Sequence, residues 1–353
     1  GDIEITEDIL AKKSLTVYIA GQGNVDFGTD VNVTNDVNIS TEKGGITVGH
    51  TVNADEGTIS LATGNGDISV GKDVTAGKDV EISSKQGNIT VGDTATGDDG
   101  DVLSKAGSVS IQTDKGYVEI VKTVTAQEGS IGISSGQGDI LIGSNGPDVK
   151  TVTAKENVDL TASDGRITVY GKTSTEDGDI SLSAHKKTSD GQSTFVIDHE
   201  GELDAGRSLI LDVEGGDLHV SDRLQAKDDF AATVTETGSI YFDRDVDVSG
   251  SVLMTAENGN IDVGHSVTAG KDVGLYTDTG NIEIGQSVVS TGGDVMLAVR
   301  ETGDIQIGDL VTAGANVDIA TNTGNVDIQK SVTAETGSYP FRENFSDEIG
   351  GLL

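Results

Sequence analysis

The sequence predicts an all-β fold, a parallel β-helix with three short strands in each coil of about 21 residues. One observation is a repeat, whose copies open at Gly259, Gly280, Gly303 and Gly324 as Gly-Asn-Ile-Asp-Val, Gly-Asn-Ile-Glu-Ile, Gly-Asp-Ile-Gln-Ile and Gly-Asn-Val-Asp-Ile. A second is that apolar and polar residues alternate inside each copy, as in half-buried strands. The third is length, since so short a repeat cannot bury its own apolar face and must stack on its neighbours.

The apolar residues of successive copies occupy equivalent positions, so that like residues stack on like. Strands wound in one direction then form a helix of triangular section, which we expect to be right-handed. The predicted core ladder consists of Ile261, Val263, Val267, Val273, Leu275, Ile282, Ile284, Val288, Ile305, Ile307, Val311, Val317 and Ile319. Glycine and polar residues between the strands suit tight turns, where Asp and Asn cap their own backbone.

Glycines that open a coil recur from Gly1 to Gly324 and predict about 15 coils, hence a rod about 70 Å long. We expect residues 1–336 to form a single solenoid, because each coil of a repeat protein contacts only its neighbours. The composition of 49 Gly, 2 Pro and no Trp suits thin coils with aliphatic ladders.

The coils are irregular between about residues 94 and 206. Thr94–Gly100 contains almost no apolar residue, Ser144–Asp148 is an insertion, and Lys186–Gly191 is a polar excursion. Counting strands places the three segments after the second, first and third strand of their coils. Loops vary without disturbing a stack, so we expect binding specificity in this stretch.

Residues 337–353 depart from the repeat and are expected to be a cap or a linker, with a partner-docking peptide as the alternative. Phe341, Phe345 and Ile349 lie four residues apart, a spacing that predicts one apolar helical face.

The chain has 59 acidic and 23 basic residues, a formal charge of −36. Nucleic acid is therefore excluded as an expected partner, and anionic membranes are disfavoured. The charge serves solubility by repulsion; divalent-cation binding and adaptation to high salt are the alternatives. Without cysteine, disulfides and thiolate metal sites are excluded.

No apolar run reaches membrane-spanning length, so we expect no membrane insertion. No signal peptide is recognisable, and the chain begins within the repeat pattern. We expect it to be an internal piece or a processed product of a longer protein.

Ligand-binding candidates are the places where basic and aromatic residues gather. They are Lys115 with Tyr117, Arg166 with Tyr170, and His185, Lys186 and Lys187 with Phe195 and His199. Each group can equally be a solvated turn with a packed ring. Carboxylate pairs follow from the composition alone, so no catalytic residue is assigned.

Metal sites have little support in the sequence. The five histidines lack zinc-site spacing, and His50 and His265 follow Val-Gly in equivalent turns, which indicates a turn role. Asp98, Asp99 and Asp101 are candidates for weakly bound calcium, although no calcium-loop motif is present. No other cofactor is expected.

The recurring Gly-Asn-Ile-x-Ile-Gly-x-x-Val-Thr-Ala-Gly-x-x-Val-x-Leu-x-Thr, clearest at Gly259–Thr277 and Gly303–Thr321, resembles the repeats of filamentous-haemagglutinin-type adhesins. The resemblance covers about residues 1–334. It implies a secreted or surface-exposed rod of a bacterium with an outer membrane, exported with an outer-membrane secretion partner or as an autotransporter. No amino-terminal secretion domain of that family is recognisable here.

The resemblance also implies a non-catalytic function, attachment to a glycan or protein receptor on cells, host surfaces or a biofilm matrix. One alternative is a polysaccharide lyase or hydrolase, since parallel β-helices also host such enzymes. The other is a passive spacer or surface filament whose ends associate with each other.

Overall fold

The computed structural model describes residues 1–93, 99–144, 150–186 and 195–338, and the backbone of Phe341 and Arg342. These residues belong to two compact units, Gly1–His185 (unit 1) and Lys186–Leu353 (unit 2). Both units consist of parallel strands in consecutive triplets, and the described residues contain no helix. In each unit the first, second and third strands of the triplets form sheets A, B and C, which confirms the predicted parallel β-helix.

The described residues of unit 1 form eight strands in each sheet. Its sheet A consists of β1 (Ile3–Ile5), β4 (Val25–Phe27), β7 (Ile46–Val48), β10 (Ile68–Val70), β13 (Ile89–Val91), β16 (Val118–Ile120), β19 (Ile140–Ile142) and β22 (Ile167–Tyr170). Its sheet B consists of β2 (Ile9–Ala11), β5 (Val31–Val33), β8 (Val52–Ala54), β11 (Val74–Ala76), β14 (Val102–Ser104), β17 (Val124–Ala126), β20 (Thr151–Ala154) and β23 (Lys172–Thr175). Its sheet C consists of β3 (Leu15–Gln22), β6 (Val37–Lys43), β9 (Ile59–Thr63), β12 (Val80–Ser84), β15 (Val109–Thr113), β18 (Ile131–Ser135), β21 (Val158–Ala162) and β24 (Ile180–His185).

In unit 2, the part of the chain that the structure describes forms seven strands in each sheet. Its sheet A consists of β25 (Phe195–Glu200), β28 (Asp217–Val220), β31 (Ile240–Phe242), β34 (Ile261–Val263), β37 (Ile282–Ile284), β40 (Ile305–Ile307) and β43 (Val326–Ile328). Its sheet B consists of β26 (Leu203–Ala205), β29 (Leu224–Ala226), β32 (Val246–Val248), β35 (Val267–Ala269), β38 (Val288–Ser290), β41 (Val311–Ala313) and β44 (Val332–Ala334). Its sheet C consists of β27 (Leu209–Glu214), β30 (Phe230–Thr235), β33 (Val252–Asn258), β36 (Val273–Thr279), β39 (Val295–Thr302), β42 (Val317–Thr323) and β45 (Phe341–Arg342).

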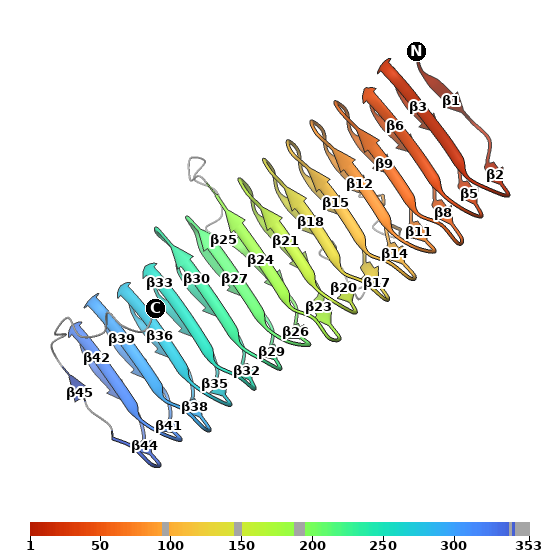
Figure 1. Cartoon of the computed structure of the whole chain (residues 1–353). Coiled ribbons are helices and arrows are strands. Elements are labelled where there is room, and N and C mark those ends of the chain that lie inside the picture. The colour runs from red at the N-terminus through yellow and green to blue at the C-terminus, as the bar shows by residue number, and fades with distance from the viewer. Residues whose placement is uncertain (94–98, 145–149, 187–194, 339–340, 343–353) are drawn as a thin grey trace. The chain divides into compact units, whose positions relative to one another are not determined.

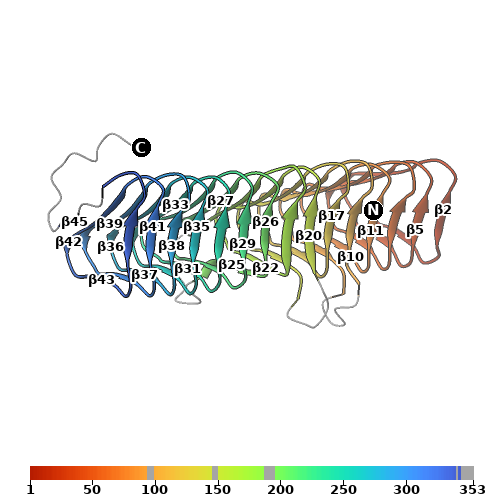
Figure 2. The same cartoon turned by 90° about the horizontal axis from the view of Figure 1, so that it is seen from below.

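Neighbouring strands lie side by side, as Figure 1 shows for sheet C in each unit and Figure 2 shows for sheet B. The register pairs equivalent positions, for example Ile261 with Ile282 and Ile282 with Ile305. Every residue of the predicted core ladder is at most 1% exposed. Burying each such side chain contributes roughly 1.5–3 kcal/mol, so stacked aliphatic ladders stabilise the coils.

Short polar side chains at the turns connect each coil to the next. The Asn24 Oδ1 accepts the Gly45 N–H at 2.9 Å, and the Asp67 Oδ1 accepts the Asn88 N–H at 2.7 Å. Equivalent bonds, from a backbone N–H to a side-chain oxygen of the preceding coil, occur in the turns before strands of sheet B and of sheet C. We expected these residues to cap their own turns, but in these bonds they cap the backbone of the following coil. Their short side chains reach it because equivalent turns stack in register.

Buried hydroxyl groups form a further ladder near the ends of successive strands of sheet C. The Thr277 Oγ1 donates to the Gly259 carbonyl oxygen at 2.8 Å, and Thr321 bonds to Gly303 in the same way. A side chain at Gly280 would fit poorly, because its φ is +142° and an added Cβ would lie 2.1 Å from the Gly259 oxygen. These contacts explain why glycine recurs at the start of the coils.

Two details differ from the sequence prediction. β13 ends at Val91 and β14 begins at Val102, so Thr94–Gly100 follows the first strand of its coil rather than the second. In this second strand buried Ser104 stands where other coils have Ala, such as Ala76. Phe341 lies in β45, which pairs with β42, and not in a helix; Phe345 and Ile349 lie outside the described residues.

The segments Ser144–Asp148 and Lys186–Gly191 fall between β19 and β20 and between β24 and β25, after a first and a third strand as predicted. Residues 94–98, 145–149 and 187–194 lie outside the described residues. Within the residues that are described, none belongs to a helix long and apolar enough to cross a membrane.

Candidate functional site

The first two candidate pairs occupy separate places in unit 1. Tyr117 is 41% exposed just before β16, and its N–H bonds to the Asn88 Oδ1 at 3.1 Å, while Lys115 is exposed in the same turn. Arg166 directly precedes β22 and Tyr170 is its last residue; both are half-buried, and the Arg166 N–H donates to the Asp139 Oδ1 at 2.8 Å. Both pairs take part in the coil stack through their backbone.

The third candidate group divides between the two units. His185 ends β24 in unit 1, with its Nε2 3.3 Å from the Ser183 Oγ. Lys186 begins unit 2, and its N–H donates to the Glu214 carbonyl oxygen at 3.0 Å. Lys187 lies outside the described residues.

His199 is not a surface residue, which corrects its assignment as a ligand-binding candidate. Its exposure is 0%, and it occupies the inward position that Val220 fills in the next coil. The Nδ1 lies 3.1 Å from the Gly201 carbonyl oxygen. Burial lowers the pKa of His199 to about 4, with hydrogen bonds opposing, so the imidazole is neutral at pH 7.

Phe195, in contrast, belongs to a group of side chains on the outer face of sheet A in unit 2. We call Phe195, Asp198, His219, Tyr241 and Asp243 the sheet A cluster. The register places Asp198 beside His219 and His219 beside Tyr241 on β25, β28 and β31. Three aromatic rings and two carboxylates therefore meet within three successive coils.

Ring stacking and hydrogen bonds hold the sheet A cluster together. The Phe195 ring stacks on His219 with centroids 4.8 Å apart, and Tyr241 meets Phe195 edge-on at 6.1 Å. The His219 Nδ1 lies 2.7 Å from the Asp198 Oδ1, and its Nε2 lies 3.4 Å from the Asp243 Oδ2. The hydrogen bond to Asp198 raises the pKa of His219, burial opposes this, and Asp243 adds to it.

The cluster remains accessible to a ligand and carries excess negative charge. The side chains of His219, Asp198 and Asp243 are 17%, 26% and 57% exposed. Glu200, at the end of β25, is exposed as well, and partial burial followed by repulsion from Asp198 raises its pKa. One imidazole between several carboxylates leaves this surface attractive to cations.

The row continues with acidic residues on β34 and β37. Asp262 and Glu283 are in register on neighbouring strands. Burial raises the pKa of Asp262 first, and the charges of Glu283 and Asp243 raise it further. A carboxyl group with a raised pKa beside a second carboxyl group is a common arrangement for general acid and base catalysis.

Sequence reasoning missed His219, Tyr241 and Asp243 because they lie 21 or more residues apart from their partners and follow no short motif. The outward positions of a β-helix vary freely, so no periodic pattern marks them. A register table of outward residues, with Asp198, His219 and Tyr241 in one row, would have brought them together.

The calcium candidates have other partners in the structure. The Asp101 Oδ1 accepts the Thr123 N–H at 3.1 Å and the Thr123 hydroxyl at 2.7 Å, and Asp99 pairs with Lys72 at 3.5 Å. Asp98 lies outside the described residues. Among the described residues, no group of three or more His, Cys, Asp or Glu is arranged to hold a metal ion.

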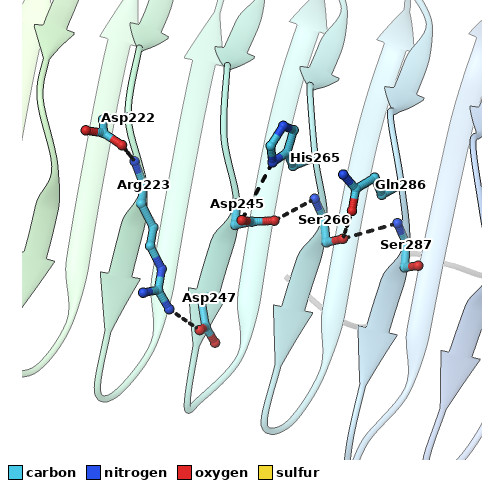
Figure 3. A network of polar contacts seen from close by, with 8 residues as sticks. All are labelled: Asp222, Arg223, Asp245, Asp247, His265, Ser266, Gln286 and Ser287. Carbon is cyan, nitrogen blue, oxygen red and sulfur yellow. Dashed lines mark hydrogen bonds and ion pairs between the residues drawn. The ribbon is translucent and has the colours of Figure 1, made fainter.

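Polar networks at the turns show how the acidic residues are used elsewhere. In Figure 3 the Asp245 Oδ1 accepts the Ser266 N–H at 3.1 Å, and the Ser266 Oγ lies 3.4 Å from the Ser287 N. The His265 Nδ1 lies 3.7 Å from the Asp245 Oδ2. The His50 Nδ1 lies 3.8 Å from the Asp30 Oδ1 in an equivalent turn of unit 1. These acids stabilise the stack, whereas those of the sheet A cluster face a group of aromatic rings.

Comparison with known proteins adds no relative. No protein-family model, curated protein or solved structure matches the chain.

Proposed function

We propose that the chain is a segment of a secreted or surface-bound bacterial adhesin that attaches to a glycan through the sheet A cluster and performs no catalysis. The repeat that resembles filamentous-haemagglutinin-type adhesins supports this proposal. In such a protein the β-helix displays binding residues outside the cell, and an outer-membrane partner serves its export.

The observation that carries the proposal is the gathering of Phe195, His219 and Tyr241 with two carboxylates on one outer face. These residues are not part of the core. The inward positions of the same strands are filled by other side chains, most of them apolar and all of them buried. Aromatic rings offer a flat apolar surface to a sugar ring, and carboxylates accept hydrogen bonds from its hydroxyl groups.

Charge narrows the class of glycan. A chain with a formal charge of −36 repels acidic polysaccharides, and the cluster adds local negative charge. Aromatic faces beside carboxylates also attract organic cations. We therefore propose that the ligand is an amino-sugar polymer, with uncharged polysaccharides bound less tightly.

A retention assay tests this proposal. The purified chain is immobilised and exposed to hexamers of glucosamine, N-acetylglucosamine and galacturonic acid. We expect retention to decrease in that order, and Phe195→Ala or Asp243→Asn to weaken glucosamine-hexamer binding about tenfold.

Matched controls are Tyr117→Ala, an exposed tyrosine before β16, and Asp247→Asn, an exposed aspartate paired with Arg223 at 2.6 Å. Both should bind as the unmodified chain does. Preferential retention of the galacturonic acid hexamer, or no retention of any hexamer, would contradict the proposal, and the latter result would favour a passive spacer.

The second candidate function is polysaccharide hydrolysis, favoured by the Asp262 and Glu283 pair in the same row. In that case Asp262 would act as the acid and Glu283 as the base. Incubation would shorten a polymer, and Asp262→Asn or Glu283→Gln would abolish the shortening without abolishing retention. Recovery of polymer at its original length excludes this function for the polysaccharides used.

A further inference from the structure

A shallow groove of about 330 Å³ lies on the outer face of sheet C in unit 1, far in sequence from the sheet A cluster. Its lining residues belong to five neighbouring strands, β3, β6, β9, β12 and β15, and to the turns that follow them. Its floor is formed by the middle three strands and spans about 14 Å along the stack at about 4.8 Å per strand. This length accommodates several units of an extended chain.

The groove has a floor because the side chains of one outward row differ in size from coil to coil. Ser40, Ala62 and Ser83 are in register on three successive strands and are small. The larger Tyr18 and Gln112 occupy the same row on the strands at either side. A depression three coils long thus lies between an aromatic ring and an amide.

Tyr18 presents its ring to solvent in a fixed position. Its side chain is 61% exposed, the highest value among the exposed tyrosines of the described residues. The Tyr18 Oη donates to the Glu42 Oε1 at 3.1 Å, and the Glu42 Oε2 accepts the Gly21 N–H at 3.1 Å. A large exposed ring held by hydrogen bonds at the end of a groove is a preorganised stacking surface.

Charged side chains of both signs form one wall. Glu42, Lys85 and Asp114 occupy the turn side of the groove, and Gly64 leaves a gap between the first two. Glu42 is engaged by Tyr18, whereas Lys85 and Asp114 form no side-chain hydrogen bond or ion pair with other described residues. The wall therefore offers one donor and one acceptor without a large net charge.

We infer that this groove is a second saccharide site, which binds an uncharged polysaccharide independently of the sheet A cluster. A sugar ring stacks on Tyr18, and the hydroxyl groups of the chain bond to Ser40, Ser83, Gln112, Lys85 and Asp114. An extended peptide fits less well, because both neighbouring coils already pair the backbone of the floor strands and leave no free strand edge.

The test is calorimetric titration of the full chain with cellohexaose, laminarihexaose and maltohexaose. We expect at least one hexaose to bind, and Tyr18→Ala to weaken that binding about tenfold. Ala62→Arg should also weaken it, because the longer side chain fills the floor. Both positions face outward, so circular dichroism and the thermal midpoint should be unchanged.

Control variants separate this site from the first one. Tyr117→Ala in unit 1 should leave hexaose binding unchanged, and Phe195→Ala in unit 2 should leave the Tyr18-dependent binding of the hexaose unchanged. Equal affinity of the unmodified chain, Tyr18→Ala and Ala62→Arg would overturn the inference, as would absence of binding to all three hexaoses. Loss of hexaose binding in Phe195→Ala alone would assign uncharged sugars to the sheet A cluster and equally refute a second site. None of these outcomes depends on whether the glucosamine hexamer binds.

Discussion

The outer face of sheet C differs between the two units. In unit 1 its outward rows include many small polar residues, such as Ser60, Ser83 and Ser134, beside larger ones such as Tyr18. In unit 2 the corresponding rows carry Ile210, which is 48% exposed, and Leu253, which is 39% exposed. The inward rows of both units are nonetheless buried aliphatic ladders.

Inward and outward positions are therefore subject to different structural constraints. An inward residue must match the coils above and below it, because a single ladder passes through all of them. An outward residue touches only its neighbours in the row and solvent, so it can change from serine to leucine without altering the coil. We therefore expect functional residues in outward rows whose side chains differ in type from those of the neighbouring rows.

The largest effect should come from placing a charge in the inward ladder. Val311, 0% exposed in β41, is replaced by Asp. A buried unpaired carboxylate should lower the free energy of unfolding by about 4 kcal/mol, measured by urea denaturation. Ile284→Asp should act similarly.

The matched control is Thr312→Asp, the outward neighbour of Val311 on the same strand. It should change the free energy of unfolding by less than about 0.5 kcal/mol. Equal effects of the two substitutions would contradict the separation of inward and outward rows.

The next largest effect is a loss of folding stability at acid pH. His199 is buried as the neutral imidazole with a pKa of about 4, against 6.5 in the unfolded chain. As the pH falls from about 6.5 to 4, the unfolded state binds the proton first, and stability should fall by about 3 kcal/mol. His199→Leu should remove this acid dependence. A denaturation series over pH measures it, and an unchanged slope in the variant would contradict the assignment.

His219 should act in the opposite direction. Its pKa is raised in the folded state by Asp198 and Asp243, so its stabilising contribution is complete below 6.5, the pKa of the unfolded group, and is lost as the pH rises through the folded pKa. His219→Gln should flatten the alkaline side of the stability profile and leave the acid side unchanged.

A smaller effect is expected from the hydroxyl ladder. Thr277→Val keeps the shape of the side chain but removes the donor to the Gly259 carbonyl oxygen. Stability should fall by about 1–2 kcal/mol, because that partly buried oxygen loses its hydrogen-bond partner. Thr279→Val, at an exposed position two residues later, serves as the control and should be close to neutral. Thermal unfolding of both variants decides the point.

The smallest effect should come from making the outer face of unit 2 resemble that of unit 1. Ile210→Ser and Leu253→Ser together should change the free energy of unfolding by no more than about 1 kcal/mol, since both side chains are partly exposed. A loss comparable with that of Val311→Asp would show that this outward row also supports the fold.

The sequence predicted the strands and the core ladder because every inward residue repeats its neighbour. Val267, Val288 and Val311, for example, stack in one column, and any one of them indicates the others. The prediction failed at Thr94–Gly100, which follows the first strand of its coil and not the second, because the residues of this segment carry no repeat pattern that fixes the strand count.

The candidate site was only partly predictable. Phe195 was chosen for its proximity in sequence to basic residues, whereas its actual partners are His219 and Tyr241 in the next two coils. His199 was chosen for its type, but alternation turns it inward. Which face a residue takes, and which distant residue lies beside it, depends on the register between coils of unequal length.

The most direct test of this account is side-chain footprinting of the aromatic residues in the absence and presence of glucosamine hexamer. We expect Phe195 and Tyr241 to become protected when the hexamer is bound, while Tyr117 keeps its reactivity. Protection of Tyr117 to the same extent, or no protection at Phe195 and Tyr241 when the hexamer is bound, would contradict the claim that a few outward positions carry the binding function.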